Sequence, residues 1–401
     1  MELSSAEKST GYLADIMENN INKVFVSILI VVIGLFIPAC EENVSPPASM
    51  RLNLAVNVVD TTGFYYEHFG SDLVDSADVY INSISYYTNN DTISDSLGVA
   101  QFIQILPDRY NISASKRVKV NLNNKYFDYI LNGQVQDVSI FQDNTITLYV
   151  YPSLPGQLLF SEIYYNGSPP QAPYNIPQYF HDQFTEIYNN SDEVIYLDSI
   201  IISDVDYGHA EEDFVYAIHA YMFPGSGQDY PLNPGEFVIV AQDAIDHTTA
   251  VPSSIDLSGA DFEYYVGPPD VDNPDIPNMI KLHHKYGVDF LYSVFNDAIV
   301  MLKVKDPYAL GYSQFDCLLL PFSSVIDGVD YRDNLSEIEY KRLPSSIDAG
   351  LTGGFESYQN KSIQRKIDFY KGDRIILMDN NNSSIDFQVM DRPTPGYIIG
   401  E

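Results

Sequence analysis

The sequence has no tryptophan, two cysteines and few basic residues. Two cysteines cannot form a disulfide framework or a thiolate zinc site, because such structures need several clustered cysteines. Lysine and arginine total 21 against 55 aspartates and glutamates, which gives a formal net charge of −34 at pH 7. Phosphate binding depends on lysine and arginine side chains that release counterions, so this balance argues against nucleic acid as a partner. It argues equally against adhesion to anionic lipid headgroups.

The sequence motifs that mark common enzymes are also missing. No H-E-x-x-H, G-x-S-x-G, G-x-G-x-x-G or Walker loop occurs. His209 and Glu211 have the H-x-E spacing of zinc deaminases, but P-C-x-x-C is absent. Carboxylates are so numerous that no glycosidase-like pair can be singled out. We therefore expect a protein that is not an enzyme and has no organic cofactor. A hydrolase with an unrecognised carboxylate site is the third alternative.

No apolar run is long enough to cross a bilayer as a helix, which takes about 20 residues. The longest run, residues 24–37 (VFVSILIVVIGLFI), has fourteen residues without a charge and follows Lys23. This length and the preceding positive charge are typical of the apolar core of a signal peptide.

The end of the apolar run resembles the bacterial lipobox, in which a cysteine carries the lipid and becomes the mature N-terminus. The small Ala39 lies directly before Cys40. We therefore expect residues 1–40 to be a lipoprotein signal peptide, whether the chain starts at Met1 or at Met17. Cys40 would anchor the protein to the membrane, since several acyl chains hold a protein there firmly.

The residues after the lipobox indicate a location. Glu41 and Glu42 resemble the acidic export tags of surface lipoproteins in some bacteria with two membranes, and residues 41–50 are expected to form a tether. We therefore expect a lipid-anchored protein of the outer membrane on the cell surface, with the periplasmic face as the alternative.

From Met50 onward, hydrophobic residues recur with period two more often than with period 3.6, which predicts an all-β protein. Residues 52–58 alternate strictly. Further strands are predicted at residues 79–81, 84–87, 99–102, 105–114, 135–141 and 145–151. No amphipathic helix is predicted in this segment.

Residues 51–151 resemble the transthyretin-like domains related to carboxypeptidase regulatory modules. Those domains carry a T-D-x-x-G-x-F turn and then a P-G-x-Y-x-I-x-V strand. The matching residues here are Asp95, Gly98, Phe102, Pro107, Tyr110 and Ile112. Asp108 and Arg109 replace the usual glycine, which is a departure from the pattern. The resemblance implies a small β-sandwich that acts as a spacer or docking unit.

Residues 152–156 (PSLPG) have the composition of a linker, and residues 157–401 resemble an expanded lamin-tail domain. The matching segments are LLFSEIYYN at 158–166, FTEIYN at 184–189, LNPGEFVIV at 232–240, DAIVML at 297–302, SIQR at 362–365 and PTPG at 393–396. This resemblance implies an immunoglobulin-like sandwich. Insertions are expected at 205–231, 242–296 and 304–361, and the tryptophan of the pattern is replaced by Ile201.

The two resemblances together describe an uncharacterised family of bacterial surface lipoproteins. Such a family implies a location and an architecture, and it implies no reaction.

The best metal candidate is the acidic segment DVDNPD, in which Asp270, Asp272 and Asp275 could supply oxygen ligands to calcium. Calcium takes about six to eight such ligands. The segment is not an EF-hand, because its sixth position is Asp275 rather than glycine and its twelfth is Lys281. The alternative is a solvated acidic loop without an ion.

The 32 tyrosines indicate a second kind of site, because tyrosine is enriched at protein interfaces. Tyrosine also favours strands, so packing within the sandwich is the alternative. The candidates in the expected insertions are Tyr207, Tyr216, Tyr221, Tyr230, Tyr264, Tyr265 and Tyr286.

We expect the insertions to form a binding face, because loops on a rigid scaffold usually carry function. The expected partner is another envelope protein, such as an outer-membrane barrel. The alternative is a stand-alone module that binds glycan or peptide, and the missing tryptophan argues mildly against glycan.

The lipobox predicts the outcome of one substitution. Cys40→Ala removes the acylated thiol and should release the protein from the membrane fraction, as measured by cell fractionation and immunoblotting. Cys317→Ala, which removes the other cysteine, should leave the protein in that fraction. Continued membrane retention of the Cys40→Ala protein would refute the lipobox interpretation.

Overall fold

The computed structural model describes residues 51–401 except positions 87, 123–124, 155, 171–177, 207–212 and 400–401. The predicted signal peptide, Cys40, the tether and Tyr207 therefore lie outside the described residues. Within the described part, no helix is both long enough and apolar enough to span a bilayer.

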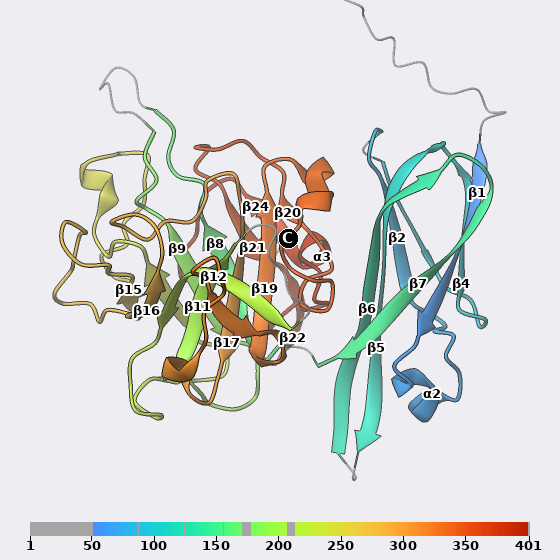
Figure 1. Ribbon diagram of the computed structural model, residues 1–401, viewed down its shortest axis with the longest axis horizontal. Helices are drawn as coiled ribbons and strands as arrows, with labels where there is room; N and C mark the ends of the chain where they lie inside the picture. Colours follow the sequence, from blue (N-terminus) through green and yellow to red (C-terminus); the bar gives the residue numbers. More distant parts are fainter. Residues whose placement is uncertain are drawn as a thin grey trace, which may run out of the picture. The chain divides into compact units, whose positions relative to one another are not determined.

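Seven strands between residues 52 and 153 form one sheet that folds over a single core, drawn in blue and teal in Figure 1. The strand order is β3-β2-β5-β6-β7-β1-β4, and β1 and β7 form its parallel pair. The strands are β1 (Leu52–Asp60), β2 (Asp78–Ser83), β3 (Asn89–Ile93), β4 (Val99–Ile105), β5 (Asp108–Leu122), β6 (Lys125–Ile140) and β7 (Asn144–Ser153).

The alternation in β1 is confirmed, since Leu54, Val56 and Val58 are fully buried while their neighbours are less so. The strand predicted at residues 84–87 is wrong for its described part, because residues 84–86 form a turn. The cause is Asp108, the residue that departs from the transthyretin-like pattern. Its carboxylate accepts hydrogen bonds from the backbone N–H of Ser85 at 2.8 Å and from the Ser85 hydroxyl at 2.6 Å, which bends the chain there.

A short helix, α2 (Phe64–Phe69), was not expected from the sequence. It is bounded by Gly63 and Gly70, whose φ angles of 83° and 81° lie in the left-handed region that favours glycine. Six residues are too few for a helical period to be recognised in the sequence.

The segment from residue 158 onward forms two facing sheets. One has the order β15-β14-β9-β8-β21-β24 and the other β16-β12-β11-β17-β19-β20, with β18 also paired to β12. The strands of the first sheet are β8 (Leu158–Tyr164), β9 (Phe184–Asn189), β14 (Phe237–Ala241), β15 (Phe262–Glu263), β21 (Ser362–Arg365) and β24 (Phe387–Met390). Those of the second are β11 (Ile200–Val205), β12 (Phe214–Met222), β16 (Ile280–His284), β17 (Asn296–Lys303), β18 (Leu318–Pro321), β19 (Val325–Arg332) and β20 (Thr352–Gly353).

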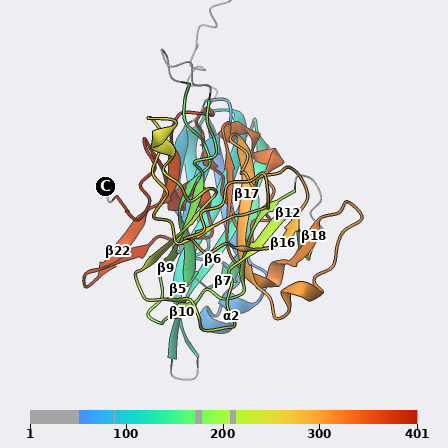
Figure 2. The same ribbon diagram turned by 90° about the vertical axis from the view of Figure 1, so that its left-hand side faces the viewer.

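Smaller elements flank these sheets. One two-stranded sheet pairs β10 (Ile195–Tyr196) with β13 (Pro231–Leu232). A hairpin pairs β22 (Ile367–Lys371) with β23 (Arg374–Leu377) and projects from its sandwich in Figure 2. The remaining helical turns are α3 (Ser383–Asp386), η2 (His247–Thr249), η3 (Pro307–Ala309), η4 (Phe322–Ser324) and η5 (Leu335–Tyr340).

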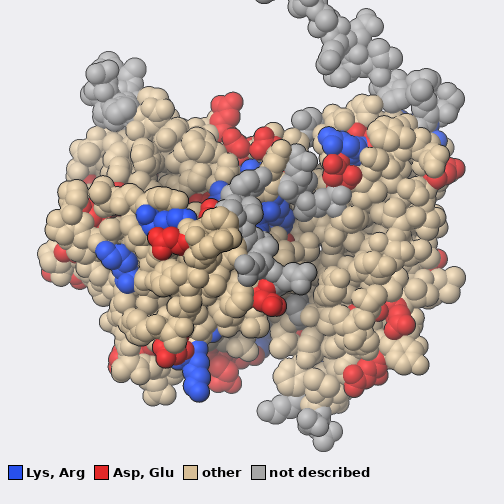
Figure 3. All heavy atoms as spheres, viewed as in Figure 1, with Lys and Arg blue, Asp and Glu red and all other residues tan. Residues whose placement is uncertain are grey.

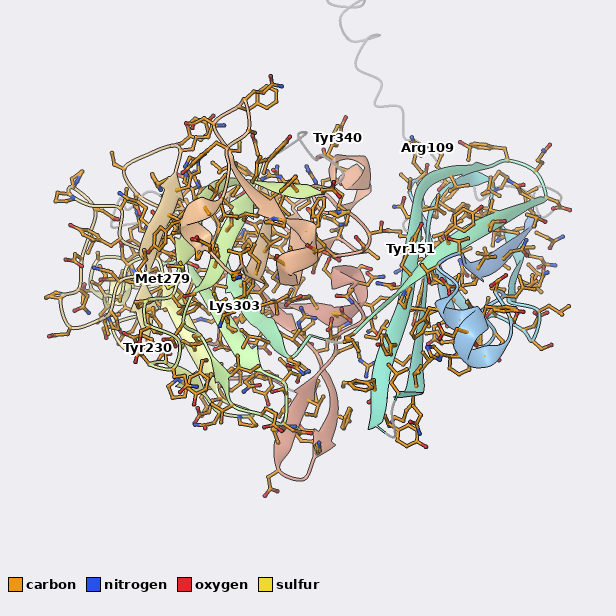
Figure 4. All side chains as sticks on the ribbon, turned by 60° about the horizontal axis from the view of Figure 1, so that its bottom comes forward. Arg109, Tyr151, Tyr230, Met279, Lys303 and Tyr340 are labelled. Carbon is orange, nitrogen blue, oxygen red and sulfur yellow. The ribbon has the colours of Figure 1, made fainter. Side chains whose placement is uncertain are left out.

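The main core of this second sandwich lies between its two sheets. It joins residues such as Phe160 and Ile163 of β8 to Ile202, Ile299 and Val329 of the facing sheet. Met279 belongs to the same cluster and Tyr230 packs against it; both residues are labelled in Figure 4. The structure is almost entirely β and sandwich-like, as the hydrophobic pattern predicts.

The strands of this sandwich bury charged and polar side chains as well as apolar ones. Every residue of β8 and β9 is buried, including Glu162 and Glu186. Glu162 accepts hydrogen bonds from the Ser362 hydroxyl and from the backbone N–H of Thr394 at 2.9 Å. Glu186 accepts one from the Ser161 hydroxyl at 2.7 Å and one from the backbone N–H of Gly396. These glutamates therefore fasten the C-terminal PTPG segment to the middle of a sheet.

Arg365, the last residue of β21, is the largest of the fully buried side chains. Its guanidinium donates two hydrogen bonds to the Asp327 carboxylate at 3.0 and 2.8 Å, and its Nε donates one to the Phe160 carbonyl at 2.9 Å. It also lies 3.5 Å from Asp379 and 3.6 Å from Asp386. One cation therefore ties β8, β19, β21 and the segment before β24 together.

Arg365→Met should destabilise the protein by about 3–5 kcal/mol, because it leaves buried carboxylates without their counter-charge. The free energy of unfolding can be measured by urea titration of the full chain. Arg109→Ala is the control, because it removes a pair in which both side chains are largely exposed and should cost less than about 1 kcal/mol. A loss for Arg365→Met no larger than the control's would contradict this account of the ion cluster.

Candidate functional site

Three aspartates from distant parts of the sequence converge in the loops of the second sandwich. Carboxylate oxygens of Asp243, Asp270 and Asp289 all lie within 4.8 Å of one another. Asp243 is buried, and Asp270 and Asp289 are partly exposed. We refer to these three residues as the carboxylate cluster. All three lie in the insertion expected at 242–296.

The end of β14 positions Asp243. This residue lies two positions after the last residue of β14, and its carbonyl oxygen faces Nε2 of the buried His247 at 3.0 Å. Because a carbonyl can only accept, His247 Nε2 carries the proton, and Nδ1 accepts from the Tyr179 hydroxyl at 2.8 Å. Burial lowers the pKa of His247, which keeps this imidazole neutral. The turn that carries Asp243 is therefore fixed on both sides.

Contacts with residues just before β9 hold Asp289 in place. Gln183, just before β9, donates to the Tyr292 carbonyl at 3.0 Å and accepts from the Tyr292 N–H at 2.7 Å. This fixes the chain three residues after Asp289. His181 Nδ1 lies 2.7 Å from the Asp289 carboxylate, and the hydrogen bond between them raises the pKa of His181. Gln242 donates to the other Asp289 oxygen.

Asp270 belongs to the loop between β15 and β16. Its carboxylate accepts hydrogen bonds from the backbone N–H groups of Val266 at 2.7 Å and Val271 at 2.9 Å. Glu263 fastens the same loop by accepting from the backbone N–H groups of Asn273 at 2.7 Å and Ala244 at 2.9 Å. The loop is thereby held against the turn that carries Asp243.

The three aspartates singled out in the sequence separate in the structure. Asp270 joins the carboxylate cluster, whereas Asp272 and Asp275 are exposed and lie outside it. Asp272 accepts a hydrogen bond from the Asn278 amide at 2.9 Å. Calcium binding at Asp270, Asp272 and Asp275 stays a prediction; the carboxylates that lie close to Asp270 are those of Asp243 and Asp289.

The local electrostatics favour the uncharged forms of Asp243 and Asp270 by raising their pKa values. Burial, with repulsion from Asp289 and Asp270, raises the pKa of Asp243 to about 8. Burial and repulsion from Asp289 raise the pKa of Asp270 to about 6. Among the described residues, His181 is the one basic side chain that forms an ion pair with the cluster. Lys and Arg side chains are also few and scattered on the face of the molecule shown in Figure 3.

Sequence reasoning missed Asp243, Asp289, His181 and Gln242. Each acidic residue is a single aspartate after apolar residues (VIVAQD and YGVD), which carries no metal-binding pattern. The one available signal for the two aspartates was their place inside the expected insertion 242–296. This insertion lies between the segments LNPGEFVIV and DAIVML, which match the lamin-tail pattern.

A second feature is an exposed aromatic surface beside β12, which we call the aromatic edge. β16 and β18 both pair with β12, along different parts of it, and the three strands lie together in Figure 2. The loops that follow β16 and precede β18 are joined by His283 Nε2, 3.1 Å from the Asp316 carbonyl, and by Lys285, 3.3 Å from Cys317. Large exposed side chains on these loops are Tyr286, Val288, Tyr308, Tyr312 and Phe315.

The tyrosines predicted to form a binding face differ in exposure: some are buried, some are partly buried and one is exposed. Tyr216, Tyr221 and Tyr264 are buried, so their rings pack inside the protein and do not meet a partner at its surface. Tyr230 and Tyr265 are partly buried. Tyr286 is 60% exposed and belongs to the aromatic edge.

Cys317 is buried, and β18 begins one residue later.

Comparison with known proteins finds a family model that matches part of the chain. Residues 233–394 match the model of DUF4876, a family of proteins of unknown function. The matched segment contains all three residues of the carboxylate cluster and most of the aromatic edge. No significant match is found among curated proteins.

The solved structures give a likeness over most of the chain. A DUF4876 family protein from Bacteroides thetaiotaomicron VPI-5482 is 25% identical, with a TM-score of 0.54; the match covers 84% of this chain and 94% of that one. A Pseudomonas aeruginosa protein for which carbohydrate binding has been proposed is 12% identical over 25% of this chain and 88% of its own. Its TM-score of 0.20 is too low to support an argument about fold or function.

The raised pKa of Asp243 predicts how the free energy of unfolding depends on pH when a chelator keeps the protein free of metal. Its folded-state pKa of about 8 lies above the usual 3.8, so between these values the folded protein holds a proton that the unfolded chain has lost. This contribution to stability is fully present at acid pH and is lost as the pH rises through about 8. We expect the loss of this contribution to lower the free energy of unfolding by on the order of 3 kcal/mol.

The measurement is urea unfolding in EDTA at several pH values between about 5 and 9. Asp243→Asn has no proton to lose at this position, so its stability should fall less steeply with pH than that of the wild type. Identical pH profiles for the two proteins would contradict the assigned role of Asp243.

Proposed function

We propose that the protein is a non-catalytic, lipid-anchored component of the cell envelope that binds another envelope protein through the aromatic edge. An outer-membrane barrel is the type of partner that suits a protein anchored in the same membrane. Cys40 would supply the anchor.

The observation that carries this proposal is the exposure of the aromatic edge on a firmly built scaffold. Tyr286, Tyr308 and Tyr312 are 60%, 73% and 54% exposed. Tyrosine presents a large, rigid contact area with a polar end, and it is enriched where proteins bind each other. The sheet beneath these loops is fixed, since β12 is paired with β11 on one side and with β16 and β18 on the other.

One further observation supports a binding role over a catalytic one. Glu162 and Glu186, which might be taken for an acid pair, are fully buried. They accept hydrogen bonds from the backbone N–H groups of Thr394 and Gly396, which hold the C-terminal segment. Side chains enclosed in this way have no room for a substrate.

Partner capture should depend on the aromatic edge. We expect a Tyr286→Ala/Tyr312→Ala variant to recover at least tenfold less partner, because a few aromatic residues carry most of the binding energy at such surfaces. The measurement is crosslinking in intact cells, followed by affinity purification of the lipidated protein and quantitative mass spectrometry.

The matched control is Tyr66→Ala, since Tyr66 is 61% exposed and lies on the first sandwich. It should recover the partner as well as the wild type does. An equal loss in both variants, or no reproducible partner at all, would overturn the proposal. Saturable binding of the protein to a glycan array would support the stand-alone module instead.

A further inference from the structure

We infer that the carboxylate cluster is a calcium site, in which oxygens of Asp243, Asp270 and Asp289 and the side-chain carbonyl of Gln242 bind the ion. This inference does not depend on the aromatic edge or its partner.

The first argument is that buried oxygen atoms at the cluster have no partner. Asp243 Oδ1 and Gln242 Oε1 are both buried and make no hydrogen bond, and each residue is only 2% exposed. Gln242 donates its amide to Asp289, so its carbonyl oxygen lies beside the cluster. A buried acceptor without a donor costs about 1–3 kcal/mol, and more when it is charged. A cation would satisfy both oxygens at once.

The second argument is that positive charge is missing here but present at comparable places in the same sandwich. Buried Asp297 lies 2.6 Å from Arg342, and buried Asp327 lies 2.8 Å from Arg365. In the part of the chain that the structure describes, Asp243 and Asp270 form no such ion pair, and Asp289 has only His181. Three ionised carboxylates at this distance repel one another, and His181 is the one described basic side chain that pairs with them.

The donor atoms and their spacing point to calcium. All the proposed ligand atoms are hard oxygen donors. Calcium prefers such donors, whereas zinc and copper also bind nitrogen and sulfur. Two oxygens bound to one calcium ion can lie up to about 5 Å apart, since each bond is about 2.3–2.6 Å long. The spacing of up to 4.8 Å fits that range. Magnesium demands near-ideal octahedral geometry and gives up its water ligands reluctantly, so a site with several protein oxygens favours calcium. The partial exposure of Asp270 and Asp289 leaves room for water ligands.

The test is isothermal titration of calcium chloride into the full, lipidated chain purified in detergent and freed of metal with EDTA. We expect saturable binding of one ion with a dissociation constant on the order of 10⁻⁴ M, the range of extracellular calcium modules. Asp243→Asn and Asp270→Asn should each weaken binding at least tenfold. Magnesium chloride should bind at least tenfold more weakly than calcium.

Matched controls come from the same loop. Asp272→Asn and Asp275→Asn remove exposed carboxylates that lie outside the cluster, so calcium affinity should stay within about twofold of the wild type. If these variants lose affinity as Asp243→Asn does, the ion binds elsewhere in the acidic loop and the assignment is wrong.

Thermal unfolding separates a lost ligand from a failure to fold. In EDTA at neutral pH, Asp243→Asn should melt at or above the wild-type temperature, because the variant does not have to take up a proton at this position on folding. In calcium, the wild type should gain several degrees and Asp243→Asn almost none. No heat of binding and no rise in the wild-type melting temperature at millimolar calcium would overturn the inference. That outcome would leave the proposed docking at the aromatic edge untouched.

Discussion

The second sandwich depends on one buried cation. Arg365 lies in the interior with its guanidinium bonded to Asp327 and to the Phe160 carbonyl, and with Phe387 packed against its face at 4.6 Å. A charge in such a place is tolerated only when it is paired and hydrogen-bonded, so the strands that supply its partners cannot move apart independently. The SIQR segment therefore fixes where β8, β19 and the segment before β24 must meet.

The same principle distinguishes scaffold from site. Within the scaffold, buried Asp297 has Arg342 beside it, whereas buried Asp198 accepts hydrogen bonds from three backbone N–H groups. In the described part of the loop layer, Asp243, Asp270 and Asp289 come together without an arginine, and the pKa of Asp243 rises to about 8. A carboxylate in the interior needs hydrogen bonds, a proton or a counter-ion. In EDTA the loop layer relies on a proton on Asp243; in our account, calcium is the counter-ion when it is present.

Whether a feature could be predicted from the sequence depends on how far apart along the chain the interacting residues lie. The alternation of Leu54, Val56 and Val58 is a local pattern, and it placed β1 and the all-β fold correctly. The strand expected at residues 84–87 failed because Asp108, far along the chain, bends its described part into a turn. Asp270 could be singled out because it stands among other acidic residues. Asp243 and Asp289 could not, since only the contacts of Gln183 and His247 bring these single aspartates to the same place.

The most direct test of this account is a crystal structure of the protein grown in calcium, with anomalous diffraction measured at a long wavelength. We predict one anomalous peak bonded to oxygens of Asp243, Asp270 and Asp289 at about 2.3–2.6 Å, with the ion pair between Arg365 and Asp327 unchanged. An ordered carboxylate cluster with no peak in millimolar calcium, or a peak held by Asp272 and Asp275 instead, would contradict it.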